Sequence, residues 1–226
     1  MTEQEIYDIK KQICEIGENL WLRGMVASND GNISVRIGEG LFVTTPSGVS
    51  KKYMTPEMMI TMNAENKVVG EPNGFKPSSE FKLHLKCYEL RPEVNAVVHA
   101  HPPIATGYAV SRVPLDGYNM SEAVMLLGSV PVAEYATPGS DEVADSIAEF
   151  LPYHDAILLA NHGAVTMGKN LMTAYFRMES VEQVAKTTLV SRLLGGAQEL
   201  PKDKIDELCD IGKNYALRHP GYRKYS

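Results

Sequence analysis

The 226-residue sequence is poor in cysteine, has no excess of basic residues and contains no long apolar run. Its three cysteines, Cys14, Cys87 and Cys209, lie far apart and form no CxxC motif, so we expect reduced, mostly buried thiols. A formal net charge of −6 leaves no basic footprint for nucleic acid. No apolar run approaches the roughly 18 residues of a membrane span, and the first residues lack a secretory signal pattern. We therefore expect a cytoplasmic protein without a nucleic-acid or membrane partner.

Apolar spacing predicts a chain of mixed helices and strands. Helical spacing covers residues 3–23, 170–194 and about 202–217, and a further helix follows the segment KPSSE, with Ser78 or Ser79 as its N-cap. Short β-rich runs predict strands at ISVRI, LFVTT, MMITM, NAVVHAH, SVPVAEY and AILLAN. No repeat or linker divides the chain. We therefore predict one α/β domain over residues 1–226 with a mostly antiparallel sheet, ending in a C-terminal helix and mobile tail at about 202–226.

Two histidines stand one residue apart at the end of the apolar run NAVVHAHPP, residues 95–103. If this run is a strand, His99 and His101 point to the same face, whereas Val98 and Ala100 point to the other. Two charged imidazoles a few ångströms apart would repel each other, but two neutral ones can share a cation. A pair of surface histidines at a strand end is the alternative interpretation.

Two further residues favour a metal site. His162 follows the apolar strand AILLAN at a glycine turn, and Glu80 lies at the start of the helix that leads into the His99 strand. Three histidines and one carboxylate suit Zn²⁺, which accepts nitrogen and oxygen ligands and keeps a position open for substrate. His84 forms an ExxxH pair with Glu80, either as a ligand pair or in a structural role near the site. We expect His154 and His219, in polar segments, to be solvated.

Three short segments are candidates for binding an anion. KPSSE places Ser78 and Ser79 at a helix N-terminus, where free amides attract phosphate. SNDGN, residues 28–32, and TPSG, residues 45–48, are glycine-bearing loops rich in hydroxyl and amide donors. Each segment alone is an ordinary turn. Together, and next to a metal candidate, they favour recognition of a phosphate group.

The motifs GNISVR, TPSG, PSSE, VVHAHPP and NHG occur in this order along nearly the whole chain. In their order and spacing they resemble the class II aldolase/adducin family, and in particular its zinc-dependent L-fuculose-1-phosphate aldolases. The resemblance implies a three-layer α/β/α domain around a largely antiparallel sheet. It also implies a homotetramer with fourfold symmetry and active sites at the subunit interfaces.

The resemblance also implies roles for individual residues. His99, His101 and His162 would bind zinc, with Mn²⁺ or Co²⁺ as substitutes, and Glu80 would be a ligand that doubles as the catalytic acid/base. Two tyrosines would take part in catalysis: Tyr118 from a neighbouring subunit, placed only by allowing a gap of about two residues, and Tyr215 in the C-terminal tail. The residues that would hold the substrate phosphate are Asn29, Asn32, Ser47, Gly48, Ser78 and Ser79.

The implied reaction is reversible cleavage of a ketose 1-phosphate into dihydroxyacetone phosphate and a small aldehyde such as lactaldehyde. L-Fuculose 1-phosphate and a 5-deoxypentulose 1-phosphate are the candidate substrates, since residues 112–122 differ from the fuculose-phosphate aldolase pattern. Pentulose-phosphate 4-epimerases carry aspartate where this chain has Glu80, which favours the aldolase. Dehydratases and decarboxylases on the same scaffold stay open. A non-catalytic, adducin-like binding module is the remaining alternative, disfavoured because the histidines and Glu80 are all present.

Overall fold

The computed structural model describes residues 1–70 and 74–218, and the tail predicted to be mobile falls partly outside these ranges. A seven-stranded sheet forms the centre, with the strand order β3-β2-β1-β4-β7-β6-β5. All neighbouring strands are antiparallel except β5 and β6, which are parallel, so the predicted mostly antiparallel sheet is confirmed. The strands are β1 (Asn32–Gly38), β2 (Leu41–Thr44), β3 (Ile60–Asn63), β4 (Ala96–Ala100), β5 (Val132–Ala133), β6 (Ala156–Leu159) and β7 (Gly163–Gly168).

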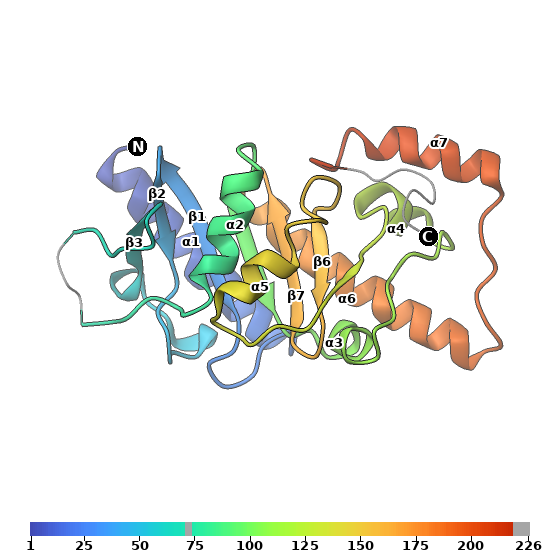
Figure 1. Cartoon of the computed structure of the whole chain (residues 1–226), viewed down its shortest axis with the longest axis horizontal. Helices are drawn as coiled ribbons and strands as arrows, with labels where there is room; N and C mark the ends of the chain where they lie inside the picture. The colour runs from blue at the N-terminus through green and yellow to red at the C-terminus, as the bar shows by residue number, and fades with distance from the viewer. Residues whose placement is uncertain (71–73, 219–226) are drawn as a thin grey trace.

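Helices cover both faces of the sheet, which gives the three layers that the family resemblance implied (Figure 1). In Figure 1, α2 and α5 lie in front of the strands, whereas α1 and α6 lie behind them. The helices are α1 (Glu3–Leu22), α2 (Phe81–Leu90), α3 (Pro103–Val110), α4 (Ser121–Leu126), α5 (Asp141–Ser146), α6 (Leu171–Leu193) and α7 (Lys202–Gly212). Two 3₁₀ turns, Lys51–Tyr53 and Pro56–Met58, connect β2 to β3.

The alternation of side chains along β4 explains how one strand serves both layers. Ala96, Val98 and Ala100 pack into the core formed with α1, α3 and α6, whereas Val97 packs into the core formed with α2 and α5. His99 therefore faces the α2 side of the sheet. Because β4 lies between β1 and β7, this histidine is completely buried near the middle of the sheet.

Three sequence-based boundaries are wrong. The predicted strand SVPVAEY is reduced to β5, because it pairs only with β6 and begins after Pro131, which has no N–H to donate. The last helix ends at Gly212 instead of residue 217. Neither Ser78 nor Ser79 is the N-cap of α2: Ser78 closes a turn by accepting from the backbone N–H groups of Glu80 and Phe81, so Glu80 is the N-cap.

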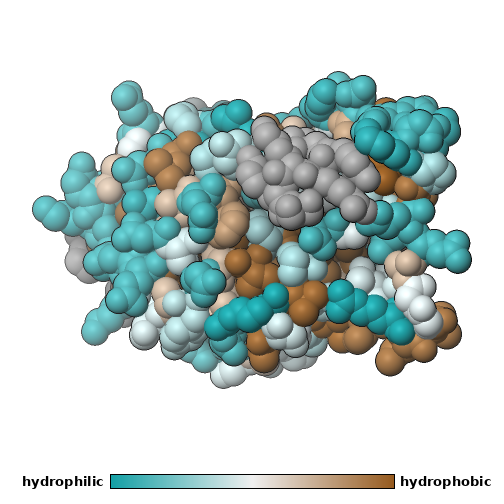
Figure 2. All heavy atoms as spheres, turned by 45° about the vertical axis from the view of Figure 1, so that its right-hand side comes forward, coloured by the Kyte–Doolittle hydropathy of each residue, from teal (hydrophilic) through white to brown (hydrophobic). Residues whose placement is uncertain are grey.

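Exposed apolar side chains gather toward the C-terminal end of α6. Leu193 is 78% exposed and Leu194, which follows the helix, is 82% exposed. Figure 2 shows an apolar patch at the lower right, on the side where this helix end comes forward. Contiguous apolar surface of this kind is typical of contact sites between proteins. In the described part of the chain, none of the helices has the length and apolar character that a membrane crossing requires.

Candidate metal centre and active site

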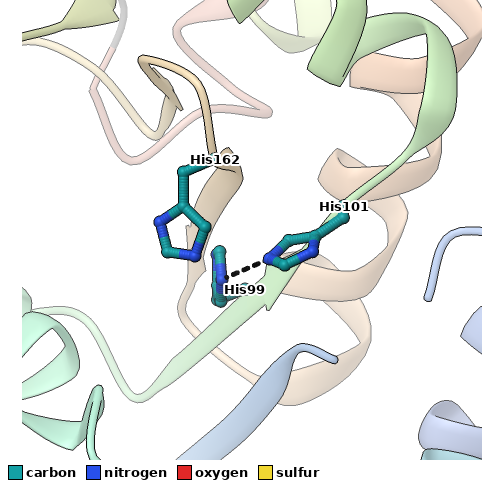
Figure 3. Close-up of side chains that lie close together, drawn as sticks. All are labelled: His99, His101 and His162. Atoms are coloured by element: carbon teal, nitrogen blue, oxygen red, sulfur yellow. Dashed lines mark hydrogen bonds between the residues drawn. The ribbon is translucent and has the colours of Figure 1, made fainter. Parts of the chain in front are cut away.

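Two central strands and one hairpin turn bring the predicted histidines together. His99 lies in β4 and His101 directly follows this strand, whereas His162 lies in the turn between β6 and β7. That turn is tight, since Leu159 pairs with Gly163 and Asn161 adopts a left-handed backbone with φ of 55°. Figure 3 shows the three imidazoles converging from these two places in the sequence.

The three rings are close enough to share one cation. The Nε2 atoms of His99 and His101 are 3.1 Å apart. The centroid of the His162 ring lies 4.7 Å from the ring centroid of His99 and 5.0 Å from that of His101. One ligand nitrogen from each of the three histidines lies within 4.8 Å of the other two. The prediction that His99 and His101 point the same way is confirmed, although β4 ends at Ala100, one residue before His101.

Burial favours the neutral, metal-binding form of His99 and His162. Burial lowers the pKa of His99 well below its usual value, and the neighbouring imidazoles of His162 and His101 lower it further. Burial also lowers the pKa of His162, although the Glu80 carboxylate opposes this effect. His99 Nδ1 lies 3.0 Å from the carbonyl oxygen of Ala164, so a proton on Nδ1 leaves the Nε2 lone pair facing the other rings.

Glu80 reaches this cluster from the N-terminus of α2. Its Oε2 accepts a hydrogen bond of 2.9 Å from Asn32 Nδ2 and lies 3.4 Å from His99 Nε2. Its Oε1 lies 3.2 Å from His162 Nε2 but is buried and has no hydrogen-bond partner among the described residues. Neutral imidazoles beside an unsatisfied carboxylate oxygen fit a divalent cation that accepts nitrogen and oxygen ligands. The residues present therefore suit Zn²⁺.

The loops predicted to bind phosphate lie near one another. Ser47 donates its backbone N–H to the carbonyl of Lys76 at 2.8 Å, and Pro46 bridges to Pro77, so the TPSG and PSSE segments are adjacent. Gly48 has a φ of 74°, which a residue with a side chain rarely adopts. Ser79 packs beside Gly139, where an added Cβ would lie 3.2 Å from Ser79 Oγ. Asn32 binds Glu80 through its side-chain amide.

Lys51 is a residue near the site that the sequence analysis missed. It is 2% exposed, and its Nζ donates to the backbone carbonyls of Asn29 at 3.2 Å and Val49 at 2.9 Å. It therefore connects the SNDGN loop to the end of the TPSG loop. Burial lowers its pKa to about 8, against the attraction of Asp30. Nothing in the sequence KKY distinguishes this lysine from a solvated one.

His84 makes contacts that favour the structural one of its two alternatives, and it is not in the group of histidines that could share an ion. It is completely buried, its Nδ1 lies 2.6 Å from Ser34 Oγ, and Ser34 Oγ lies 2.8 Å from Tyr88 Oη. Burial lowers the pKa of His84 to about 3. The Nδ1 of His84 is thus occupied by Ser34 of β1.

The expectation that His154 is solvated is wrong. This histidine is 1% exposed, and its Nδ1 lies 3.0 Å from the carbonyl of Ser129, because the turn after α5 folds back onto the sheet.

Within this single chain, Tyr118 and Tyr215 lie apart from the three histidines. Tyr118 is 2% exposed and packs with Val124 of α4 and with Ile205 and Cys209 of α7. Tyr215 is 59% exposed, and its carbonyl accepts from Arg177 Nη2 at 3.1 Å. The catalytic roles implied for both tyrosines stay predictions. His219 lies outside the described residues.

Comparison with known proteins places these features in a family. Residues 11–189 match the Class II Aldolase and Adducin N-terminal domain. The L-fuculose phosphate aldolase of Haemophilus influenzae is 33% identical over 218 residues, which cover 95% of each chain. The 3-oxo-tetronate 4-phosphate decarboxylase of Pectobacterium atrosepticum is 30% identical over 189 residues, which cover 80% of this chain and 84% of that protein.

A solved structure agrees with this assignment. An L-fuculose 1-phosphate aldolase superposes with a TM-score of 0.84 at 31% sequence identity, covering 91% of this chain and 96% of that chain. The family match, the relatives and the shared fold all include β4 and the turn between β6 and β7, where the three histidines lie. This chain belongs to the class II aldolase and adducin family.

Proposed function

We propose that this protein is a metal-dependent aldolase that reversibly cleaves a ketose 1-phosphate into dihydroxyacetone phosphate and a small aldehyde. L-Fuculose 1-phosphate and a related deoxyketose 1-phosphate are the substrates we favour. One observation carries the proposal: three converging imidazoles lie next to a carboxylate whose Oε1 is buried and has no hydrogen-bond partner in the described ranges. A purely structural or binding role gives no reason to bury these groups together.

His99, His101, His162 and Glu80 would hold the metal, which we propose to be Zn²⁺, with Mn²⁺ or Co²⁺ as substitutes. When bound, such an ion supplies Lewis acidity that stabilises negative charge on substrate oxygens. Burial lowers the pKa of His99 and His162 and so favours their neutral forms, and the three histidines present ligand nitrogens close to one another. An adducin-like module without chemistry would not need these arrangements.

Glu80 would return a proton to the substrate carbon from which the aldehyde leaves. Cleavage breaks the bond between C3 and C4, with loss of the proton from the C4 hydroxyl, and releases the aldehyde. The remaining three-carbon enediolate then gains a proton at C3 to become dihydroxyacetone phosphate. Asn32 holds Glu80 Oε2, so Oε1 is the oxygen left to exchange that proton. For the C4 hydroxyl proton we propose Tyr118 or Tyr215.

The adjacent loops would receive the phosphate group. Ser47, Gly48, Ser78 and Ser79 would supply hydroxyl and backbone donors, as expected for anion recognition by turns and helix N-termini. Asn29, whose carbonyl is fixed by Lys51, and Asn32 would complete the set. The short connection between the loops, through the backbone bond from Ser47 to Lys76, would preserve their spacing.

A decarboxylase is the second candidate, because relatives of nearly equal similarity carry that name. Loss of CO₂ from a 3-oxo-tetronate 4-phosphate also leaves a three-carbon ketose phosphate, by carbon balance. The two reactions therefore need the same stabilised enediolate and the same proton return, and they differ in the fragment that leaves. Epimerase and dehydratase activities would use the same metal site but would release neither fragment.

We also propose that the chain assembles as a homotetramer with active sites at subunit interfaces. The family resemblance implies this assembly, and the exposed Leu193 and Leu194 supply apolar surface suited to a contact between proteins. Light scattering coupled to size-exclusion chromatography measures the assembly directly. A monomeric mass with full activity would exclude a site completed by a neighbour.

The test of the function is a substrate panel with the zinc-loaded protein. It contains L-fuculose 1-phosphate, a 5-deoxypentulose 1-phosphate and 3-oxo-tetronate 4-phosphate, and dihydroxyacetone phosphate, aldehyde and CO₂ are measured separately. We expect dihydroxyacetone phosphate and an aldehyde in equal amounts from one ketose 1-phosphate. Release of CO₂ and dihydroxyacetone phosphate in equal amounts from 3-oxo-tetronate 4-phosphate, with no aldehyde from either ketose 1-phosphate, would replace the aldolase with the decarboxylase. A silent panel with bound zinc would reject both and favour an epimerase or dehydratase.

A further inference from the structure

His101 is not held by strand pairing as His99 is, since β4 ends at Ala100. Its backbone N–H donates to the carbonyl of Met25 at 2.9 Å, which belongs to the segment between α1 and β1. The side chain is 24% exposed, whereas that of His99 is fully buried. The position of His101 therefore depends on residues 25–31.

This segment is fixed tightly against β4. A Cβ on Gly31 would lie 2.8 Å from the carbonyl oxygen of His99 and 2.8 Å from Val26 Cγ1, and Gly31 has a φ of 73°. On the other side, the Lys51 ammonium binds the carbonyl of Asn29. Asp30 stands between these two fixed residues. Its backbone is thereby held beside His101.

The Asp30 carboxylate lies against the ring nitrogen of His101 that faces away from the cluster. Asp30 Oδ2 is 3.4 Å from His101 Nδ1, whereas His101 Nε2 is 3.1 Å from His99 Nε2. An acceptor at Nδ1 favours the tautomer that carries its proton there, which leaves the Nε2 lone pair free. In His99 a backbone carbonyl, that of Ala164, occupies the equivalent position.

We propose that Asp30 is a positioning residue for His101, which orients the ring and selects the tautomer whose Nε2 faces the metal site. This inference rests on the proposed metal site and adds a residue to which no role was given. A carboxylate behind a metal-binding imidazole also makes the imidazole a stronger donor, and loss of such a partner typically weakens metal binding by about 10- to 100-fold.

The experiment compares zinc retention by Asp30→Asn, Asp30→Ala and a control, Glu39→Gln, in the full-length zinc-loaded chain. Glu39 is exposed in the turn at the far end of β1, so Glu39→Gln removes the same charge as Asp30→Asn without touching His101. Zinc transfer to a chromogenic chelator gives the affinity. The visible absorption of the Co²⁺-loaded proteins reports the geometry of the ligands.

We expect Asp30→Ala to weaken zinc binding about 10- to 100-fold and to change the Co²⁺ spectrum. Asp30→Asn should show a smaller loss, because its amide oxygen can serve as an acceptor at the same position, and Glu39→Gln should match the wild type. Equal affinity and identical spectra for all four proteins would overturn the role of Asp30 while leaving the metal site intact. If the wild type itself retains no zinc, the proposed metal site fails and this inference fails with it. If Asp30→Ala does not fold, Asp30→Asn against Glu39→Gln decides the question.

Discussion

At the scale of single residues, the two oxygens of Glu80 have different surroundings, which makes a direct test of proton transfer possible. Glu80→Gln keeps the size of the side chain and a partner for Asn32 but cannot carry a proton. We expect turnover to fall at least about 100-fold, the usual contribution of general acid–base catalysis, with unchanged folding. The rate of dihydroxyacetone phosphate release measures turnover, and thermal unfolding checks the fold.

A second readout separates proton transfer from cleavage. Hydrogen exchange at C3 of dihydroxyacetone phosphate in D₂O, followed by NMR, needs no aldehyde and should also be lost in Glu80→Gln. Glu80→Asp, which retains a shorter carboxylate, should recover part of the exchange. Undiminished cleavage and exchange by Glu80→Gln would show that another group carries the proton.

A second prediction at this scale concerns Lys51, whose contribution to the unfolding free energy should depend on pH. Its pKa is about 8 when folded, below the ordinary value of 10.5, because its ammonium is buried. Between these two pH values the unfolded chain binds the proton that the folded chain has lost, so this residue makes the protein more stable as pH rises. Relative to Lys51→Met, the wild type should gain up to roughly 3 kcal/mol in unfolding free energy from pH 8 to above pH 10.5.

Denaturant unfolding of both proteins across this pH range measures the effect, and the difference between them removes contributions from other titrating groups. Parallel pH profiles would mean that the Lys51 ammonium is not desolvated in the folded protein. Lys51→Met should also lower affinity for phosphate, because the carbonyls of Asn29 and Val49 lose their donor.

The residues of the site differ in how far the sequence could predict them. His99, His101, His162 and Glu80 stand in short motifs whose spacing indicates chemistry, and the structure brings them together. Lys51 and Asp30 gave no such signal, because their roles depend on contacts across loops distant in sequence. His154 was predicted to be solvated from its polar neighbours, whereas tertiary packing buries it.

At the scale of elements, the first residue of β7 determines how closely β7 packs against the end of β4. A Cβ on Gly163 would lie 2.5 Å from the carbonyl oxygen of Ala100 and 2.6 Å from His101 Cδ2. Gly163→Ala must therefore push apart two central strands and move His101. We expect a loss of about 1–3 kcal/mol in stability, as for other overpacked sites, together with weaker zinc binding.

Gly107→Ala is the matched control for that substitution. Gly107 lies in α3, and an added Cβ would meet nothing within 4 Å. Because alanine favours helix over glycine, this variant should be neutral or more stable by up to about 1 kcal/mol, with unchanged zinc binding. Thermal unfolding and zinc titration of both variants test the pair, and equal behaviour would contradict the role of Gly163.

Sequence periodicity located these elements more reliably than it located their ends. The apolar run at residues 95–101 indicated β4, and the period of two in a strand predicted that His99 and His101 share a face. The start of α2 was missed because Ser78 hydrogen-bonds to the next turn instead of capping the helix. That choice between two local hydrogen bonds depends on where the preceding loop packs, which no local pattern shows.

At the scale of the whole molecule, one buried carboxylate connects the sheet, two helices and the C-terminal segment. Asp155, 1% exposed, accepts from Arg91 Nη2 at 2.8 Å and lies 3.0 Å from Arg177 Nη2. It also accepts from the backbone N–H groups of Leu217, at 2.7 Å, and Arg218, at 3.1 Å. Sequence patterns did not predict this arrangement, because its members lie up to 127 positions apart, from Arg91 to Arg218.

This arrangement supplies the last prediction. Asp155→Asn leaves the buried guanidinium of Arg177 without its negative partner and removes one of two carboxylates from Arg91, which keeps Glu93 at 2.7 Å. This should cost about 3–5 kcal/mol of unfolding free energy. It should also release the segment that carries Tyr215, so limited proteolysis should remove the C-terminus faster. Asp145→Asn is the control, because its ion pair with Lys86 is at the surface and such pairs contribute about 0–1 kcal/mol. If both variants unfold at the same denaturant concentration as the wild type, Asp155 does not anchor the C-terminal segment.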